Sequence, residues 1–190
     1  MARIDYPDLT SLGPETTRLI AGRPLINVLR MWAHSEPLLP LIAGLGATQF
    51  ASLRLSPRHR ELVVLAVAQA LDAPYIADQH ASISDACGVT AAEREALGLG
   101  AHWQLGGAYF TTAEVVLVQF AIASLGAAVV PDYYFAAMRR TFSAQEIVET
   151  LSVVGYYFTI ARMTTVLEIE SDAAGDTSVI DAGIAMAGDQ

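Results

Sequence analysis

Residues 56–87 read SPRHRELVVLAVAQALDAPYIADQHASISDAC and contain two helix-forming stretches around a short turn. Ser56 and Pro57 are typical of a helix start, because a serine side chain caps the first free amides and proline suits the first helical position. A turn at residues 72–74 then ends the first apolar stretch. Short connections join antiparallel neighbours, so we expect two helices, over 57–71 and 75–87, to pack side by side.

Each of these predicted helices carries one ionisable residue on an apolar face. Glu61 shares its face with Val64 and Leu65, and His80 shares its face with Ile76 and Ile83. If the two faces meet, a carboxylate and an imidazole lie together in the core. Glu61 lies further from the turn than His80, so the contact is direct or passes through a water.

A buried pair of a carboxylate and an imidazole can pass a proton near neutral pH, because burial and mutual attraction act on its groups in opposite directions. General acid–base catalysis requires such a pair. The alternative interpretation of Glu61 and His80 is structural, either an ion pair within the core or a core histidine bonded to a backbone carbonyl. The spacing alone leaves both interpretations open.

Helix signals recur through the rest of the chain. Thr90 with Glu93 and Ser143 with Glu146 both fit the capping box, in which a hydroxyl and a carboxylate satisfy each other's backbone amides. Strand signals are weak, because the apolar runs lie inside longer windows that begin with helix starts. We therefore predict an all-α fold, with helices over 14–21, 25–33, 37–52, 57–71, 75–87, 91–97, 112–126, 132–140 and 144–168.

The composition favours self-association over insertion into a membrane. Hydrophobic residues make up 53% of the chain and charged residues only 16%, against roughly 25% charged in an average soluble protein. The uncharged apolar stretch 115–131 is diluted by polar residues and is shorter than the about 20 apolar residues of a membrane span. We expect one helical domain over 1–170 that forms homo-oligomers, followed by a mobile acidic tail over 171–190.

Charge and residue counts argue against several kinds of partner. A net charge of -9 does not suit nucleic acid, whose phosphates need a basic surface. The single cysteine, Cys87, cannot form an internal disulfide, and the four histidines lack metal-ligand spacing. The first residues lack the apolar core of a signal peptide. We expect a cytoplasmic protein without a metal or any other cofactor.

The central segment also carries a family resemblance. Arg60-Glu61-Leu62 before an apolar helix, then Tyr75 and Gln79-His80, resembles the central motif of the carboxymuconolactone decarboxylase and alkyl hydroperoxidase D superfamily. The segments 2–7, 27–35 and 153–162 are similar to other parts of the same proteins, so the resemblance covers residues 1–170. It implies an all-helical fold, trimers or hexamers, and an active site near a subunit interface.

Two departures from the family pattern limit the chemistry that the resemblance implies. The cysteine pair of the redox branch would fall on Ala73 and Ile76, and Cys87 lies beyond the motif. Peroxide reduction through a cysteine pair is therefore not expected. In the non-redox branch a second acid stands where this chain has Ile76, which argues against a mechanism that needs two carboxylates.

The resemblance assigns roles to six residues. Glu61 and His80 form the expected catalytic pair, and Tyr75 is either a phenolic proton donor or a packing residue. Arg60 and Arg162 either hold a substrate carboxylate or are structural, and His34 is either a site residue or a helix brace. The aromatic residues of 133–135 and 156–158 line a pocket or pack in the core or an interface.

The function that the resemblance implies is cofactor-independent acid–base catalysis on a small organic acid, lactone or related carbonyl compound. The reaction would be a decarboxylation, as in a lyase, or an isomerisation or ring closure through an enolate. A non-catalytic ligand-binding or assembly subunit of the same fold is the alternative. A hydroperoxide reductase is the third possibility.

Overall fold

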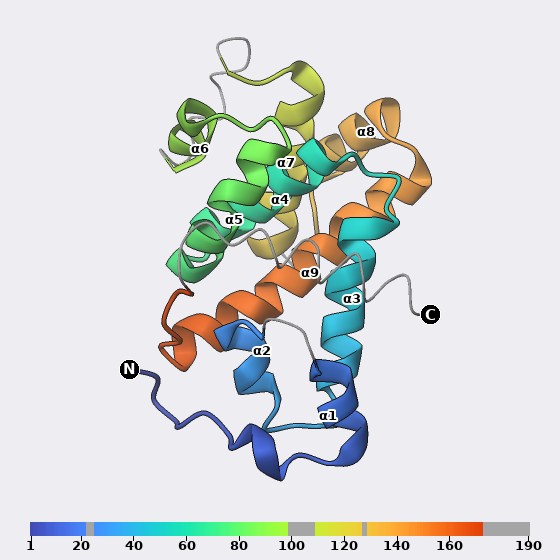
Figure 1. The fold of residues 1–190 in the computed structure, drawn as a ribbon. Coiled ribbons are helices and arrows are strands. Elements are labelled where there is room, and N and C mark those ends of the chain that lie inside the picture. The colour runs from blue at the N-terminus through green and yellow to red at the C-terminus, as the bar shows by residue number, and fades with distance from the viewer. Residues whose placement is uncertain (22–24, 99–108, 127–128, 173–190) are drawn as a thin grey trace.

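The chain folds into a bundle of helices (Figure 1). The computed structural model describes residues 1–21, 25–98, 109–126 and 129–172, and within them it contains α-helices, one short 3-10 helix and no strand. The all-α prediction is confirmed. Most of the predicted mobile tail, from residue 173 onward, lies outside the described residues. The α-helices are α1 (Pro14–Ile20), α2 (Asn27–Trp32), α3 (Leu39–Ala51), α4 (Pro57–Ala70), α5 (Pro74–Ala86), α6 (Ala91–Gly98), α7 (Thr112–Gly126), α8 (Asp132–Thr141) and α9 (Ala144–Val166).

Helix α4 forms the centre of the bundle, and every residue from 60 to 68 is buried. A helix without a polar face has to be covered all round. Helices α5, α7, α9 and α6 pack against α4 and cover it. The main apolar core lies between α4, α5, α7 and α9, and a smaller cluster fills the space between α4, α6 and α7.

The helix starts follow the capping chemistry of the sequence. The Ser56 hydroxyl accepts from the His59 amide at the start of α4, and Ser143 and Glu146 form a capping box at the start of α9. Between α4 and α5 the backbone turns at Asp72, which has a positive φ of 48°. The Ala73 amide donates to the Ala68 carbonyl at 2.9 Å. This tight turn sends α5 back alongside α4.

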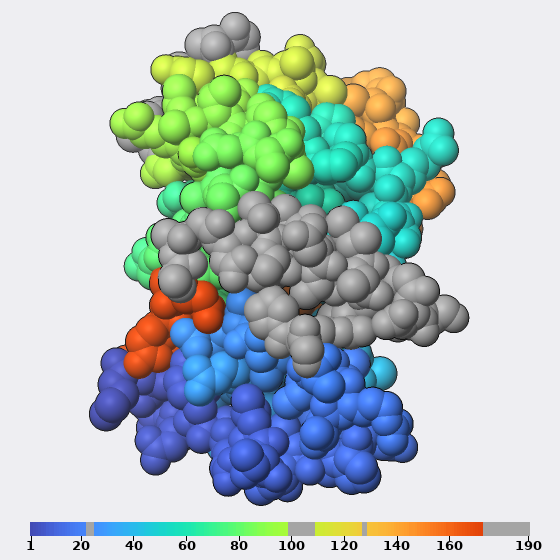
Figure 2. Space-filling model, in the orientation of Figure 1, coloured from blue at the N-terminus to red at the C-terminus, as the bar shows by residue number. Residues whose placement is uncertain are grey.

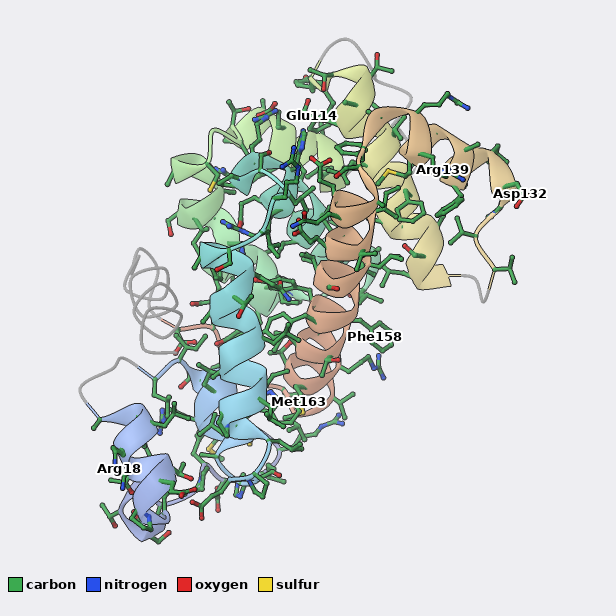
Figure 3. All side chains as sticks on the ribbon, turned by 90° about the vertical axis from the view of Figure 1, so that its right-hand side faces the viewer. Arg18, Glu114, Asp132, Arg139, Phe158 and Met163 are labelled. Carbon is green, nitrogen blue, oxygen red and sulfur yellow. The ribbon has the colours of Figure 1, made fainter. Side chains whose placement is uncertain are left out.

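Helices α3 and α9 lie side by side along one side of the molecule (Figure 3). The N-terminal residues, blue in Figure 2, cover one end of the bundle. They are joined to the end of α9 by a backbone bond from Arg3 to the Leu167 carbonyl. Of the helices described, none has the length and hydropathy of a membrane span.

Candidate active site

Glu61 on α4 and His80 on α5 meet inside the bundle. Nδ1 of His80 bonds Oε2 of Glu61 directly at 2.7 Å, without an intervening water. Glu61 lies about three residues further from the turn than His80, an axial offset of roughly 4.5 Å, and the two side chains span it. Glu61 is 0% exposed and His80 is 6% exposed. The structure therefore places a carboxylate and an imidazole together in the core.

Arg60 is the second residue that bonds Glu61. Its Nε donates to Oε1 of Glu61 at 2.9 Å, and Nη1 donates to the Gln49 carbonyl at 3.4 Å. The guanidinium lies over the Phe50 ring, 4.4 Å from the ring centre. Arg60 is itself buried. The arginine that the resemblance offers to a substrate carboxylate is thus paired with a carboxylate of the protein.

Arg60 and His80 together keep Glu61 ionised. Desolvation by burial raises the pKa of its carboxyl group, but His80 and Arg60 oppose this and hold that pKa below its usual value. An ionised carboxylate can only accept a hydrogen bond, so Nδ1 of His80 carries the proton in its bond to Glu61. The tautomer is assigned from this bonding pattern. The Nε2 atom then carries the lone pair, and no group among the described residues bonds it. Nε2 of the imidazole can therefore accept a proton and act as a base.

Aromatic rings hold the imidazole of His80 on two sides. The Phe50 ring stacks on it with centres 6.2 Å apart, and the Tyr157 ring meets it edge-on at 5.0 Å. Desolvation by burial and the Glu61 charge raise the pKa of the Tyr157 hydroxyl well above its ordinary value. The phenol therefore keeps its proton. Of the aromatic run at 156–158, Tyr157 faces the site and Phe158 projects outward from α9 (Figure 3).

Tyr75 lies on α5 but bonds a different part of the molecule. Its hydroxyl donates to Oδ2 of Asp172 at 2.5 Å and accepts from the Val28 amide at 3.3 Å. Desolvation by burial and the bond to Asp172 raise the pKa of the phenol. The structure thus joins Tyr75 to the start of α2 and to the residues after α9, and not to Glu61 or His80.

The other two predicted site residues do not join the pair either. His34 is exposed, and its Nε2 bonds the Asp5 carbonyl at 2.8 Å, which braces the N-terminal segment against the end of α2. Arg162 is exposed on α9, one turn after Phe158. No hydrogen bond or ion pair connects either of them to Glu61 or His80.

The single thiol lies near the pair without forming part of it. Nη2 of Arg60 lies 3.7 Å from the sulfur of Cys87. Desolvation by burial and the Glu61 charge raise the pKa of this thiol, so it keeps its proton and is a poor nucleophile. Ala73 and Ile76, where the redox branch has its cysteines, are buried apolar residues of the core. The described residues hold no group of three metal-ligating side chains.

The structure adds Gln49 and Phe50 to the residues that sequence patterns indicated, and of the aromatic run 156–158 it brings Tyr157 to the pair. Phe50 and Gln49 come from α3, an apolar helix that gave no sign of a site. Tyr157 belongs to an aromatic run that could equally have packed away from the pair. Four helices, α3, α4, α5 and α9, therefore contribute to the candidate site.

Comparison with solved structures shows that this bundle of helices has a known fold. A peroxidase-related protein from Ralstonia eutropha JMP134, described as an alkylhydroperoxidase AhpD core, matches with a TM-score of 0.75 and 17% identity over 96% of each chain. A peroxidase-related protein from Silicibacter sp. TM1040 matches with a TM-score of 0.74 and 17% identity over 90% of this chain and 92% of the other. The chain has an AhpD-like helical fold.

A third neighbour with this AhpD-like fold is named for an activity. A cysteine-to-alanine variant of the debrominase Bmp8, in complex with 2,3,4-tribromopyrrole, matches with a TM-score of 0.74 and 16% identity over 100% of this chain and 99% of the other. No family model and no curated protein matches the chain. At these identities the likeness establishes the fold, and the chemistry has to be argued from the site.

Proposed function

We propose that this protein is a cofactor-independent acid–base enzyme that moves a proton at the carbon next to the carbonyl group of a small organic compound. The observation that carries the proposal is the 2.7 Å bond between Glu61 and His80 in the core. A general base needs a lone pair aimed at the substrate and a partner that stabilises it once it is protonated. Nε2 of His80 supplies the first, and Glu61 supplies the second.

The proposed reaction proceeds in two proton transfers. His80 takes a proton from the carbon beside the carbonyl, and the electron pair of that C–H bond moves into the carbonyl, which gives an enolate and an imidazolium. Glu61 stabilises the imidazolium through Nδ1–H. The imidazolium then returns the proton to another carbon of the conjugated enolate, so the compound is isomerised and His80 is neutral again.

Decarboxylation, the lyase reaction of the resembling family, reaches the same enolate by another route. A substrate carboxylate leaves as carbon dioxide, its bonding electrons form the enolate, and a protonated His80 supplies the proton that quenches it. Ring closure onto a conjugated acid would also use His80 as the proton donor. The fold is compatible with catalysis, since one neighbour with the same fold is named a debrominase.

The test is the isomerisation of α-angelica lactone, an enol lactone with an acidic C–H between its carbonyl and its double bond. We expect the protein to convert it to the conjugated isomer, followed by NMR in deuterium oxide. Glu61→Gln and His80→Asn should lower kcat by about a hundredfold to ten-thousandfold, the range for general acid–base groups. Glu95→Gln, the same change at an exposed glutamate of α6, should leave the rate unchanged.

A second candidate function is a non-catalytic ligand-binding or assembly subunit. The complete burial of Glu61 favours it, because a sealed ion pair needs no substrate. In that case the wild-type rate equals the rate in buffer, and Glu61→Gln changes only the stability of the fold. A wild-type rate above the buffer rate that falls in both variants excludes this second candidate.

A further inference from the structure

The side-chain amide of Gln49 is buried without a hydrogen-bond partner. Gln49 is 2% exposed, and neither its Nε2 nor its Oε1 bonds any of the described residues. Within those residues only one other buried side-chain atom, Nε1 of Trp32, lacks a partner. Burying a polar group unpaired costs free energy, so an amide with both ends unpaired indicates a ligand or a water that completes it.

Contacts on either side place Gln49 beside the proposed site. The backbone carbonyl of Gln49 accepts a hydrogen bond from Nη1 of Arg60. The next residue, Phe50, stacks on the His80 ring and lies under the Arg60 guanidinium. Gln49 and Phe50 therefore belong to the part of α3 that faces the Glu61–His80 pair.

The preceding turn of α3 is also lined by a polar group. A Cβ added at Gly46 would lie 2.5 Å from the Tyr156 hydroxyl oxygen, so that phenol packs against the helix backbone. Gln49 follows Gly46 by three residues and shares its face. Helical side chains lean toward the N-terminus of their helix, so we expect the Gln49 amide to lie over this turn. Tyr156 in turn packs edge-on against Tyr157, the residue that holds His80.

The charges around the pair decide which kind of substrate fits. The Arg60 guanidinium and the Glu61 carboxylate offset each other at 2.9 Å, and His80 is neutral while it acts as a base. A substrate carboxylate in this site would lose its hydration beside Glu61 without gaining a cation of its own. An uncharged carbonyl compound loses much less on entering.

We propose that Gln49 recognises the substrate and that the substrate is an uncharged carbonyl compound of the lactone class. The amide N–H of Gln49 donates to the carbonyl oxygen, and its Oε1 is available to a hydroxyl group of a larger substrate. The same N–H stabilises the negative charge that this oxygen gains in the enolate. This inference rests on the proposed function and favours isomerisation of a neutral lactone over decarboxylation of an acid.

The experiment measures binding separately from turnover. The probes are α-angelica lactone and levulinate, the carboxylate that results when this lactone ring opens. Binding of each is followed by NMR in the wild type, in Gln49→Leu and in Gln69→Leu, which is the same change at an exposed glutamine of α4. We expect the wild type to bind the lactone and not levulinate, Gln49→Leu to bind the lactone at least tenfold more weakly, and Gln69→Leu to bind as the wild type does.

The melting temperature of the ligand-free protein provides a second measurement. If the amide is unpaired until a ligand arrives, Gln49→Leu should raise the melting temperature, because an apolar side chain replaces an unsatisfied group. A lower melting temperature would indicate a structural water on the amide and would overturn the proposal. Gln49→Met, which is closer in length to glutamine, replaces Gln49→Leu if the leucine variant does not fold.

Binding and turnover can fail independently. Lactone binding that depends on Gln49 supports the recognition role even if no isomerisation is detected, and then only the proposed enzyme activity is wrong. Levulinate bound as tightly as the lactone, equal lactone binding by Gln49→Leu and the wild type, or no lactone binding at all would each overturn the proposal.

Discussion

Glu61 is a buried carboxylate with a hydrogen-bond donor on each oxygen. Arg60 donates to Oε1 and His80 donates to Oε2. Burying an ion is costly unless its partners and hydrogen bonds replace the lost hydration, and here both oxygens are satisfied. Arg60 places one positive charge beside Glu61 whether or not His80 is protonated. The arrangement therefore suits a base that starts each turnover neutral.

Glu61 should stabilise the fold at neutral pH and lose this effect in acid. Desolvation alone would raise the pKa of its carboxyl group, but His80 and Arg60 hold it below the ordinary value of 4.5. A carboxyl group with a lowered pKa in the folded state stabilises the fold above the unfolded pKa, and that stabilisation disappears as the pH falls through the folded pKa. The free energy of unfolding in urea should therefore fall as the pH drops below about 4.5, and should fall less steeply in Glu61→Gln.

The Glu61→Gln variant also measures how much Glu61 contributes to the free energy of unfolding at neutral pH. Glu61→Gln leaves a buried guanidinium without its anion, so we expect a loss of about 3–5 kcal/mol. Other carboxylates with lowered pKa values, such as Glu93 and Glu114, contribute equally to both proteins and cancel in the difference. If the free energy of unfolding falls equally steeply below about pH 4.5 in the variant and in the wild type, Glu61 does not titrate as described.

The sequence predicted the pair but not the residues around it. Glu61 and His80 stood out because an ionisable residue on an apolar helix face is rare, and because the family motif covers both. Gln49 and Phe50 lie on α3, outside the motif, and only the packing of α3 against its neighbours brings them to the pair. Helical spacing favoured Phe158 as an inward-facing ring of 156–158, but Phe158 is exposed and Tyr157 is buried.

Helix bounds were predicted well because their signals are local. The helix predicted over 112–126 has the bounds of α7, and those predicted over 57–71 and 75–87 agree with α4 and α5 to within one residue at each end. Thr111 and Glu114 form a third capping box at the start of α7, which the sequence analysis did not identify. Contacts between helices were harder to predict, since they depend on residues far apart in the chain.

Arg58 shows how such a contact joins the starts of three helices. From the first turn of α4 it bonds Oε1 of Glu93 on α6 at 2.5 Å and Oε1 of Glu114 on α7 at 2.6 Å. A third donor reaches the Gly88 carbonyl. Desolvation raises the pKa of each glutamate, but Arg58 and the capping threonines outweigh it and lower both values. The arginine thus balances two carboxylates that lie mostly out of water.

Arg58→Met should destabilise the fold by about 3 kcal/mol, the lower end of the range for breaking a buried ion pair. The lower end applies because the Arg58 side chain is 29% exposed. Urea unfolding at neutral pH provides the measurement. Arg139→Met, the same change at an exposed arginine of α8, is the control and should change stability by less than about 0.5 kcal/mol. Equal stabilities for the two variants would contradict a joining role for Arg58.

The bundle buries its central helix and leaves apolar side chains on its outside. We define the α3–α9 surface as the exposed large apolar residues of these helices and of the residue before α3: Leu38, Leu41, Leu45, Val148, Leu151, Phe158 and Val166. Single exposed apolar residues are ordinary, but here they recur on two helices that pack against each other, and large exposed apolar patches often bind other proteins. With only 16% charged residues, the chain has few side chains with which to keep such a patch in water.

We expect the α3–α9 surface to be buried between copies of this chain. Light scattering should give a mass that is a multiple of 20.2 kDa. Phe158→Glu should shift it toward 20.2 kDa, because a charge buried between subunits is costly. Val129→Glu, which introduces the same charge at an apolar residue that is 80% exposed outside this surface, should leave the mass unchanged. A wild-type monomer, or an assembled Phe158→Glu variant, would refute the expectation. Because Phe158 follows Tyr157, whose ring holds His80, the dissociated variant should also turn over the lactone more slowly.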